Sequence, residues 1–211
     1  MTIDDTFRTL AAPATGEFRD RGSRFLAFAY PAHNESVIRK CLALLRTQHP
    51  KAVHHCYAYR LGLDQNNYRA NDDGEPGGSA GRPILNVLYS KNLTNVLVVV
   101  VRYFGGTLLG VPGLINAYKT ATLLALNEAE MIEQTVNETY QVRYSFEQMN
   151  DVMRLVKEQQ LTVLKQDYDT ACVLDIEVRK SLVSKVLERL GTLEGVEISL
   201  LFTVCSLLLL C

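Results

Sequence analysis

The segment RANDDGEPGGSAGRP, residues 69–83, carries the densest group of side chains that could do chemistry. It contains three carboxylates, at Asp72, Asp73 and Glu75, together with four glycines and two prolines. Such oxygen ligands suit Mg²⁺ or Ca²⁺, and carboxylates also act as general acids and bases. The spacing is not that of the calcium loop D-x-[DN]-x-[DN]-G. The alternative is a turn whose acids are solvated or paired with nearby arginines.

The length of this region also favours a functional loop. About 20 residues, from about Gly62 to Gly81, show no apolar periodicity, and compact domains rarely contain so long a connection without a function. We therefore expect this loop to form part of a functional surface.

A second candidate is the glycine-rich segment RYFGGTLLGVPG, residues 102–113. Bare amides before a helix favour anions, and the spacing of Gly105 and Gly110 resembles half of a P-loop. Val111 and Pro112 stand where that motif requires Lys and Ser or Thr, which excludes a Walker A site. Two interpretations of this segment stay open: a tight strand-to-helix turn that needs glycine dihedral angles, and a binding site for a non-nucleotide anion.

The third candidate is the run His54-His55-Cys56. Adjacent residues of a strand point to opposite faces, so the two histidines are not suited to binding one metal ion. His54 and Cys56 share a face, but no feature predicts a lowered thiol pKa or an oxyanion hole, which favours structural roles. Tyr118 and Lys119, further along the chain, are predicted to lie on an ordinary helix surface.

The elements that must position these residues are visible in the apolar pattern. In the first half, strands are expected at 23–30, 53–61 and 95–104, the last buried on both faces because its residues are continuously apolar. Helices are expected at 35–49, with Asn34 as N-cap, and at 82–92 and 114–129. This half is α+β.

The second half alternates strands and helices in a recognisable order. Strands are expected at 136–146, 161–168, 171–178 and 195–204, with helices at 147–160 and 180–191 and a turn at Asp167–Thr170. The order β-α-β-β-α-β is that of a ferredoxin-like domain. We therefore predict two domains, 1–132 and 134–211.

Composition limits the class of protein. The chain has 211 residues, of which 47% are hydrophobic and 21% charged, as in soluble globular proteins. Residues 1–130 carry 14 Lys and Arg against 11 Asp and Glu, an excess too small to predict nucleic-acid binding from charge alone. The five cysteines form no CxxC pair, which favours reduced cysteines in a cytoplasmic protein over disulfides or zinc.

The two ends of the chain carry no membrane signal. The N-terminus lacks the basic start and apolar run of a secretory signal. The apolar stretch at 198–211 has 14 residues, fewer than the roughly 20 of a spanning helix. We expect a strand followed by an apolar tail, SLLLLC, that packs on the domain or forms a homo-oligomer.

Four segments together resemble the signature of the IMPACT family: SRF near the start, HPKAVHHCYAY, DDGEPGGSAG-x-P, and VVVVRYFGGTLLG-x2-GL-x2-AY. The resemblance covers residues 17–130 for the signature domain and 134–211 for the smaller domain of bacterial members. Two departures are visible. Ser79 stands where the family usually has Thr, which keeps the hydroxyl, and Val111-Pro112-Gly113 replaces a more glycine-rich turn.

The resemblance implies a fold and a field of function. The first domain would be similar to domain 2 of ribosomal protein S5 and the second to ferredoxin-like modules, a tandem that also ends the translocating elongation factor. Eukaryotic family members regulate translation by competing for an activator of a stress-responsive initiation-factor kinase. Fold analogy alone does not establish contact with RNA.

The leading hypothesis is a cytoplasmic, non-enzymatic regulatory protein that binds RNA, the ribosome or a translation factor through its first domain, with no cofactor, metal or membrane contact. Arginine and backbone amides contact phosphate, and exposed tyrosine stacks on bases. The predicted surface comprises Asp72, Asp73, Glu75, Ser79, Arg82, Arg102, Tyr103, Gly105, Gly106, His54 and His55.

Two alternatives stay open. One is a metal-assisted hydrolase of a phosphorylated or peptide-like small molecule, with Asp72, Asp73 and Glu75 as ligands or base and His54 or His55 as acid. Binding is preferred because no nucleophile with an evident base, and no metal-ligand spacing, is found. The other alternative is a pure protein–protein adaptor.

Overall fold

A computed structural model describes residues 5–62, 66–168 and 172–205. The described chain divides into two compact units. The N-terminal unit is Phe7–Glu133, and the C-terminal unit contains the described residues from Gln134 onward together with Asp5 and Thr6. The predicted tail SLLLLC, and with it the predicted homo-oligomer contact, lies outside the described residues, as does part of the predicted turn at Asp167–Thr170.

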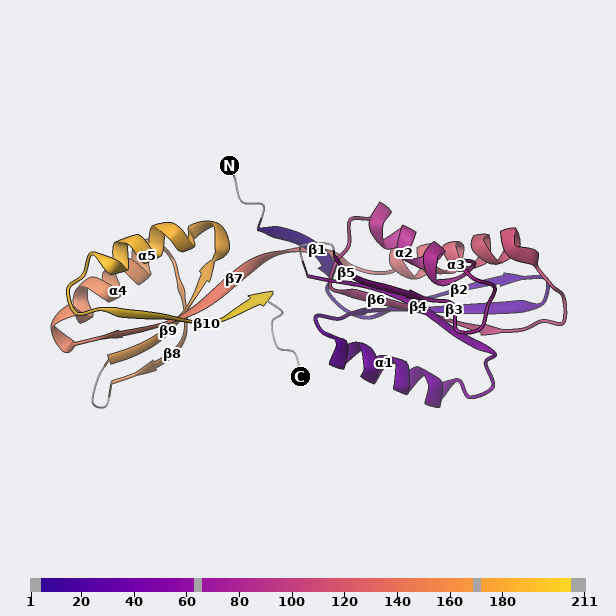
Figure 1. The fold of residues 1–211 in the computed structure, drawn as a ribbon, viewed down its shortest axis with the longest axis horizontal. Helices are drawn as coiled ribbons and strands as arrows, with labels where there is room; N and C mark the ends of the chain where they lie inside the picture. Colours follow the sequence, from indigo (N-terminus) through magenta and orange to yellow (C-terminus); the bar gives the residue numbers. More distant parts are fainter. Residues whose placement is uncertain (1–4, 63–65, 169–171, 206–211) are drawn as a thin grey trace. The chain divides into compact units, whose positions relative to one another are not determined.

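The N-terminal unit is a five-stranded antiparallel sheet with helices on both faces (Figure 1). Its strand order is β2-β3-β6-β4-β5. The strands are β2 (Ala14–Asp20), β3 (Ser23–Pro31), β4 (His54–Leu61), β5 (Asn67–Asn71) and β6 (Val96–Tyr103). Helix α1 (Glu35–Gln48) covers one face, whereas α2 (Gly81–Ser90) and α3 (Gly110–Asn127) cover the other.

Strand β6 confirms the prediction of a strand buried on both faces, since every residue from Val96 to Val101 is 0% exposed. Alternate side chains point to opposite faces. Val98 and Val100 therefore pack in the core under α2 and α3, and Val99 and Val101 pack in the core under α1. This register also decides which side of the sheet each neighbouring polar residue reaches.

Helix α1 begins where the sequence predicts. The side chain of Asn34 accepts a hydrogen bond from the backbone N–H of Val37 at 3.0 Å. Such an N-cap is worth about 1 kcal/mol because it satisfies an amide that has no partner within the helix.

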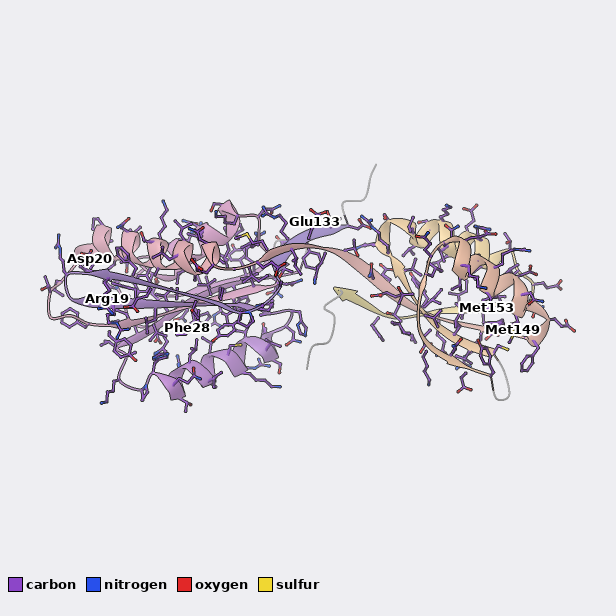
Figure 2. The ribbon with its side chains drawn as sticks, turned by 180° about the vertical axis from the view of Figure 1, so that it is seen from behind. Arg19, Asp20, Phe28, Glu133, Met149 and Met153 are labelled. Carbon is purple, nitrogen blue, oxygen red and sulfur yellow. The ribbon has the colours of Figure 1, made fainter. Side chains whose placement is uncertain are left out.

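The structure contains three strands that the sequence analysis did not predict: β1 (Thr6–Leu10), β2 and β5. β5 has the sequence NYRAN, is mostly exposed, and pairs only with β4 at the edge of the sheet. A short polar edge strand shows no apolar alternation, so pattern analysis assigns it to a loop. The expected 20-residue loop is therefore shorter, running from Asp72 to Ala80. At the other edge, Arg19 and Asp20 lead into the hairpin between β2 and β3 (Figure 2).

The C-terminal unit has the predicted β-α-β-β-α-β order. Its elements are β7 (Met131–Tyr144), whose first three residues belong to the N-terminal unit, α4 (Met149–Glu158), β8 (Thr162–Asp167), β9 (Cys172–Arg179), α5 (Val183–Gly191) and β10 (Glu197–Cys205). Two 3₁₀ turns lie at Phe146–Gln148 and Lys180–Leu182. β7 lies between β10 and β9, β8 pairs with the far side of β9, and all of these pairs are antiparallel. β1 joins the same sheet beside β7.

One face of this sheet is covered by α4 and α5, as Figure 1 shows. Val142, Leu174 and Ile176 of the strands form its core with Val152 of α4 and Val186 of α5. Met149 and Met153 of α4, labelled in Figure 2, pack against that core. Among the described residues, no helix is both long and apolar enough to cross a membrane.

Candidate functional site

The first acid of the opening loop holds the loop together. The carboxylate of Asp72 accepts hydrogen bonds from the backbone N–H groups of Gly78, Ala80 and Gly81, at 2.9, 3.0 and 2.8 Å. Because Gly81 begins α2, this carboxylate also lies at the positive end of that helix. Asp72 thus closes the loop and caps a helix that has no other side-chain cap.

The second acid fastens the loop to β4. Asp73 accepts a hydrogen bond from the backbone N–H of His55 at 2.7 Å and forms an ion pair with Arg46 at 3.4 Å. Its own carbonyl oxygen lies 2.8 Å from Nδ1 of His54. Asp73 and Gly74 adopt φ values of 42° and 90°, the left-handed backbone that Asp and Gly tolerate in tight turns.

The third acid is buried in an ion pair. Oε1 of Glu75 lies 2.6 Å from Nη1 of Arg102 on β6 and accepts a hydrogen bond from the Tyr118 hydroxyl of α3 at 2.7 Å. The Glu75 and Arg102 side chains are only 3% and 6% exposed. The guanidinium carbon also lies 5.4 Å and 5.5 Å from the ring centroids of Phe25 and Phe104. Three elements distant in sequence therefore meet at one carboxylate.

Tyr118 corrects a sequence-based expectation, because it is fully buried rather than on the helix surface. Burial raises the pKa of its hydroxyl, so the group stays protonated and donates to Glu75. The apolar periodicity of the helix does not predict the burial of Tyr118, because tyrosine has an apolar ring and a polar hydroxyl and occurs both in cores and on surfaces. Lys119, its neighbour, is exposed as expected.

Cys56 lies beside this cluster as a structural thiol. Its Sγ donates to the carbonyl of Asp72 at 2.9 Å and lies 3.3 Å from the Tyr118 hydroxyl. Burial raises the pKa of the thiol. Since the thiolate is the nucleophilic form, Cys56 is unsuited to nucleophilic catalysis.

A pocket of about 370 Å³ opens over the Glu75–Arg102 pair. Its polar floor is formed by His54, Glu75 and Arg102, with Nε2 of His54 3.9 Å from Oε1 of Glu75. All the hydrogen bonds that described residues make to the Glu75 carboxylate go to Oε1. The other oxygen, Oε2, is therefore an acceptor that these residues leave without a donor.

The wall of this pocket is apolar and exposed. Val53, Phe104, Leu108 and Val111 line it, and their exposed fractions are 57%, 47%, 81% and 47%. Large side chains gathered this way mark interaction sites, whereas isolated exposed apolar residues are ordinary. We name this feature, floor and wall together, the apolar pocket.

The glycine-rich turn serves as a close contact between backbones. A Cβ on Gly105 would lie 2.0 Å from the carbonyl carbon of Gly22 in the β2–β3 hairpin. The N–H of Gly105 donates to Oγ of Ser23 at 3.1 Å. Gly106 follows with φ of 86°, a conformation that glycine adopts without strain. These observations favour the tight-turn interpretation over an anion cradle.

The remaining predicted surface residues lie away from the apolar pocket. His55 and Tyr103 lie on the α1 face of the sheet, where burial lowers the pKa of His55 and the Tyr103 hydroxyl bonds to His49 at 2.9 Å. Ser79 is buried and its Oγ donates to the carbonyl of Pro76 at 2.6 Å. Arg82 projects from α2 into a different cavity.

The predicted surface is thus only partly one site. The structure brings His54, Glu75 and Arg102 together and assigns Asp72 and Asp73 to holding the loop. The apolar wall was missed by sequence analysis. Its signal was the run TLLGV at 107–111, whose exposed leucine and valine neither a strand nor a helix pattern requires.

The fold and this site define a two-unit α+β protein with an apolar pocket in its first unit. Residues 21–126 match the Impact N-terminal domain. The chain therefore belongs to the IMPACT family.

Relatives match along most of the chain. "IMPACT family member YigZ" of Escherichia coli is 29% identical over 183 residues, 86% of this chain and 90% of that protein. An "IMPACT family member" of Haemophilus influenzae is 32% identical over 69% of this chain and 72% of its own length. A solved structure titled "Crystal structure of an hypothetical protein" is 26% identical with a TM-score of 0.71, covering 93% of this chain and 97% of its own.

Proposed function

We propose that this protein regulates translation by binding a protein partner, a translation factor or ribosomal protein, through the apolar pocket. The link to translation rests on membership of the IMPACT family, since the resemblance implies that eukaryotic members of this family regulate translation. The observation that carries the binding proposal is the exposed wall of Val53, Phe104, Leu108 and Val111 around a polar floor.

The chemistry of the pocket favours a protein partner over RNA. Arg102 is buried against Glu75, so its charge is already compensated and does not face solvent as a phosphate contact would. Tyr103, the proposed stacking residue, is directed to the other face of the sheet. An apolar side chain inserted over an acceptor such as Oε2 of Glu75 matches the apolar core and few polar contacts of protein interfaces.

The hydrolase alternative is the weaker proposal because its three acids are engaged in the fold. Asp72 accepts three backbone amides, Asp73 accepts the amide of His55, and Glu75 is paired with Arg102. Across the described residues, no group of three or more His, Cys, Asp or Glu side chains is arranged to hold a metal ion.

Finer fold assignments accompany this proposal. We assign the C-terminal unit to the ferredoxin-like class, supported by its element order and by β7 lying between β10 and β9 in an antiparallel sheet. We assign the N-terminal unit to the class of domain 2 of ribosomal protein S5, supported by the family resemblance and by its α+β architecture, an antiparallel sheet covered by helices.

The test is affinity purification of the tagged full chain from its native cells, with nuclease treatment and mass spectrometry of bound proteins. The variants are Leu108→Asp in the apolar pocket and Leu44→Asp on the exposed side of α1, where Leu44 is 50% exposed. Burying a leucine side chain at an interface contributes about 2 kcal/mol to binding, so Leu108→Asp should lower the amount of partner recovered by at least about tenfold. Leu44→Asp should leave it unchanged.

Three results would overturn the proposal. One is recovery of neither translation factors nor ribosomal proteins with the unmodified chain. Another is equal loss of these partners in both variants, which would show that the apolar pocket is not the contact. The third is loss of the partners after nuclease treatment but not in an untreated sample, which would show that RNA is the contact.

A further inference from the structure

A second cavity, of about 570 Å³, lies between α2 and α3 and shares no lining residue with the apolar pocket. We name it the helical groove. Its lining consists of Gly78, Arg82, Pro83, Asn86, Val87, Ser90, Ile115, Lys119 and Leu123. The proposed function makes no use of it.

The charge of the helical groove has one sign. Helices α2 and α3 contain no Asp or Glu, and their two charged residues are Arg82 and Lys119, both exposed and both lining the groove. Within the part of the chain that the structure describes, neither cation has an ion pair or hydrogen bond. Their positive potential is therefore available to an anionic partner.

The spacing of the lining residues suits a helical partner. Ile115, Lys119 and Leu123 follow at four-residue steps along α3 and form one stripe. On α2, Pro83 and Val87 are also four residues apart and supply an apolar floor. The two neighbouring helices thus form an apolar groove with cations beside it. Amphipathic helices bind grooves of this kind through their apolar face.

The same lining argues against nucleic acid. Single-stranded nucleic acids bind where aromatic side chains stack on bases along a basic groove. The lining residues include no aromatic side chain, and the floor is aliphatic. Phosphates would find two cations, but the bases would find no stacking partner.

We propose that the helical groove binds an amphipathic helix of an acidic partner protein. Its apolar side chains would pack on Val87, Ile115 and Leu123, and its carboxylates would pair with Arg82 and Lys119. This site is independent of the apolar pocket, so either proposal can fail without the other.

The probe is a synthetic amphipathic peptide of about 14 residues, with leucines spaced i, i+3, i+4 and i+7 and glutamates beside them. The matched control peptide has lysine at each glutamate position. Fluorescence anisotropy with the full chain should show the acidic peptide binding about tenfold more tightly, with affinity falling as salt rises. The double variant Arg82→Glu/Lys119→Glu should reverse that preference, and Leu108→Asp should leave it intact.

Folding of the variants is checked by circular dichroism and melting temperature. If the charge-reversal variant does not fold, Arg82→Gln/Lys119→Gln takes its place and should abolish the preference for the acidic peptide. The proposal is overturned if both peptides bind equally or if removing the two cations leaves the preference unchanged. It is also overturned if single-stranded oligonucleotide or phosphatidylserine vesicles displace the acidic peptide from the groove while an excess of unlabelled acidic peptide does not.

Discussion

Replacing Glu75 with glutamine removes the buried charge opposite Arg102 with almost no change in side-chain size. The two side chains are 3% and 6% exposed and their charged atoms lie 2.6 Å apart. Removing one partner of such a pair costs about 3–5 kcal/mol, because the remaining charge stays buried without compensation. The amide oxygen of glutamine keeps an acceptor for Tyr118, so we expect a loss near the lower limit, about 3 kcal/mol. That is a large part of the 5–15 kcal/mol typical of domain stability.

The loss is measured by urea unfolding followed by circular dichroism, with hydrogen exchange of β6 amides reporting on the N-terminal unit alone. The matched control is Glu17→Gln, which removes an exposed partner of Arg24 and should cause no resolvable change. A second variant, Glu75→Gln/Arg102→Met, should recover at least half of the loss because it removes the uncompensated charge.

The reasoning is refuted if Glu75→Gln costs less than about 1 kcal/mol, since hydrogen bonding alone would account for that. It is also refuted if the double variant loses as much stability as Glu75→Gln and the single variant Arg102→Met added together. In either case the floor of the apolar pocket would not depend on the ion pair.

Three further predictions concern other parts of the chain. Gly105→Ala should destabilise the N-terminal unit by about 3 kcal/mol, because the added Cβ would lie 2.0 Å from the backbone of the β2–β3 hairpin. The control is Gly77→Ala, where the added Cβ has open space around it, and it should leave the urea midpoint of unfolding nearly unchanged. Cys56 should be alkylated by iodoacetamide far more slowly than half-buried Cys41 in the folded protein, as peptide mass spectrometry can check, and equal rates would contradict its burial. The side chain of Arg179 on β9 donates a hydrogen bond to the carboxylate of Asp5 and lowers its pKa below the ordinary value of 3.8. The unfolded chain therefore takes up the proton first as pH falls, so the stabilisation is complete above about pH 4 and is lost progressively below it. Asp5→Asn should lower the melting temperature of the C-terminal unit at pH 7 and flatten its dependence on pH below 4, and an unchanged profile would contradict this.

Much of the architecture was predictable from local pattern. The continuous apolar run of β6, the Asn34 cap of α1 and the strand–helix order of the C-terminal unit are all written in neighbouring residues. The edge strand β5 was not predictable, because exposed, mostly polar residues at a sheet edge have the composition of a loop.

The sequence by itself determined which residues were candidates: the acidic loop, the glycine turn, the histidine pair and the resemblance to the IMPACT family. Only the tertiary structure decided their roles. Glu75 meets Arg102 and Tyr118 across separations of 27 and 43 residues, and such partners depend on strand register and helix placement, which local periodicity does not contain. For the same reason only the structure shows that the acids of the loop form hydrogen bonds and ion pairs within the fold. It also shows that Leu108, which sequence analysis did not single out, is 81% exposed in the wall of the apolar pocket.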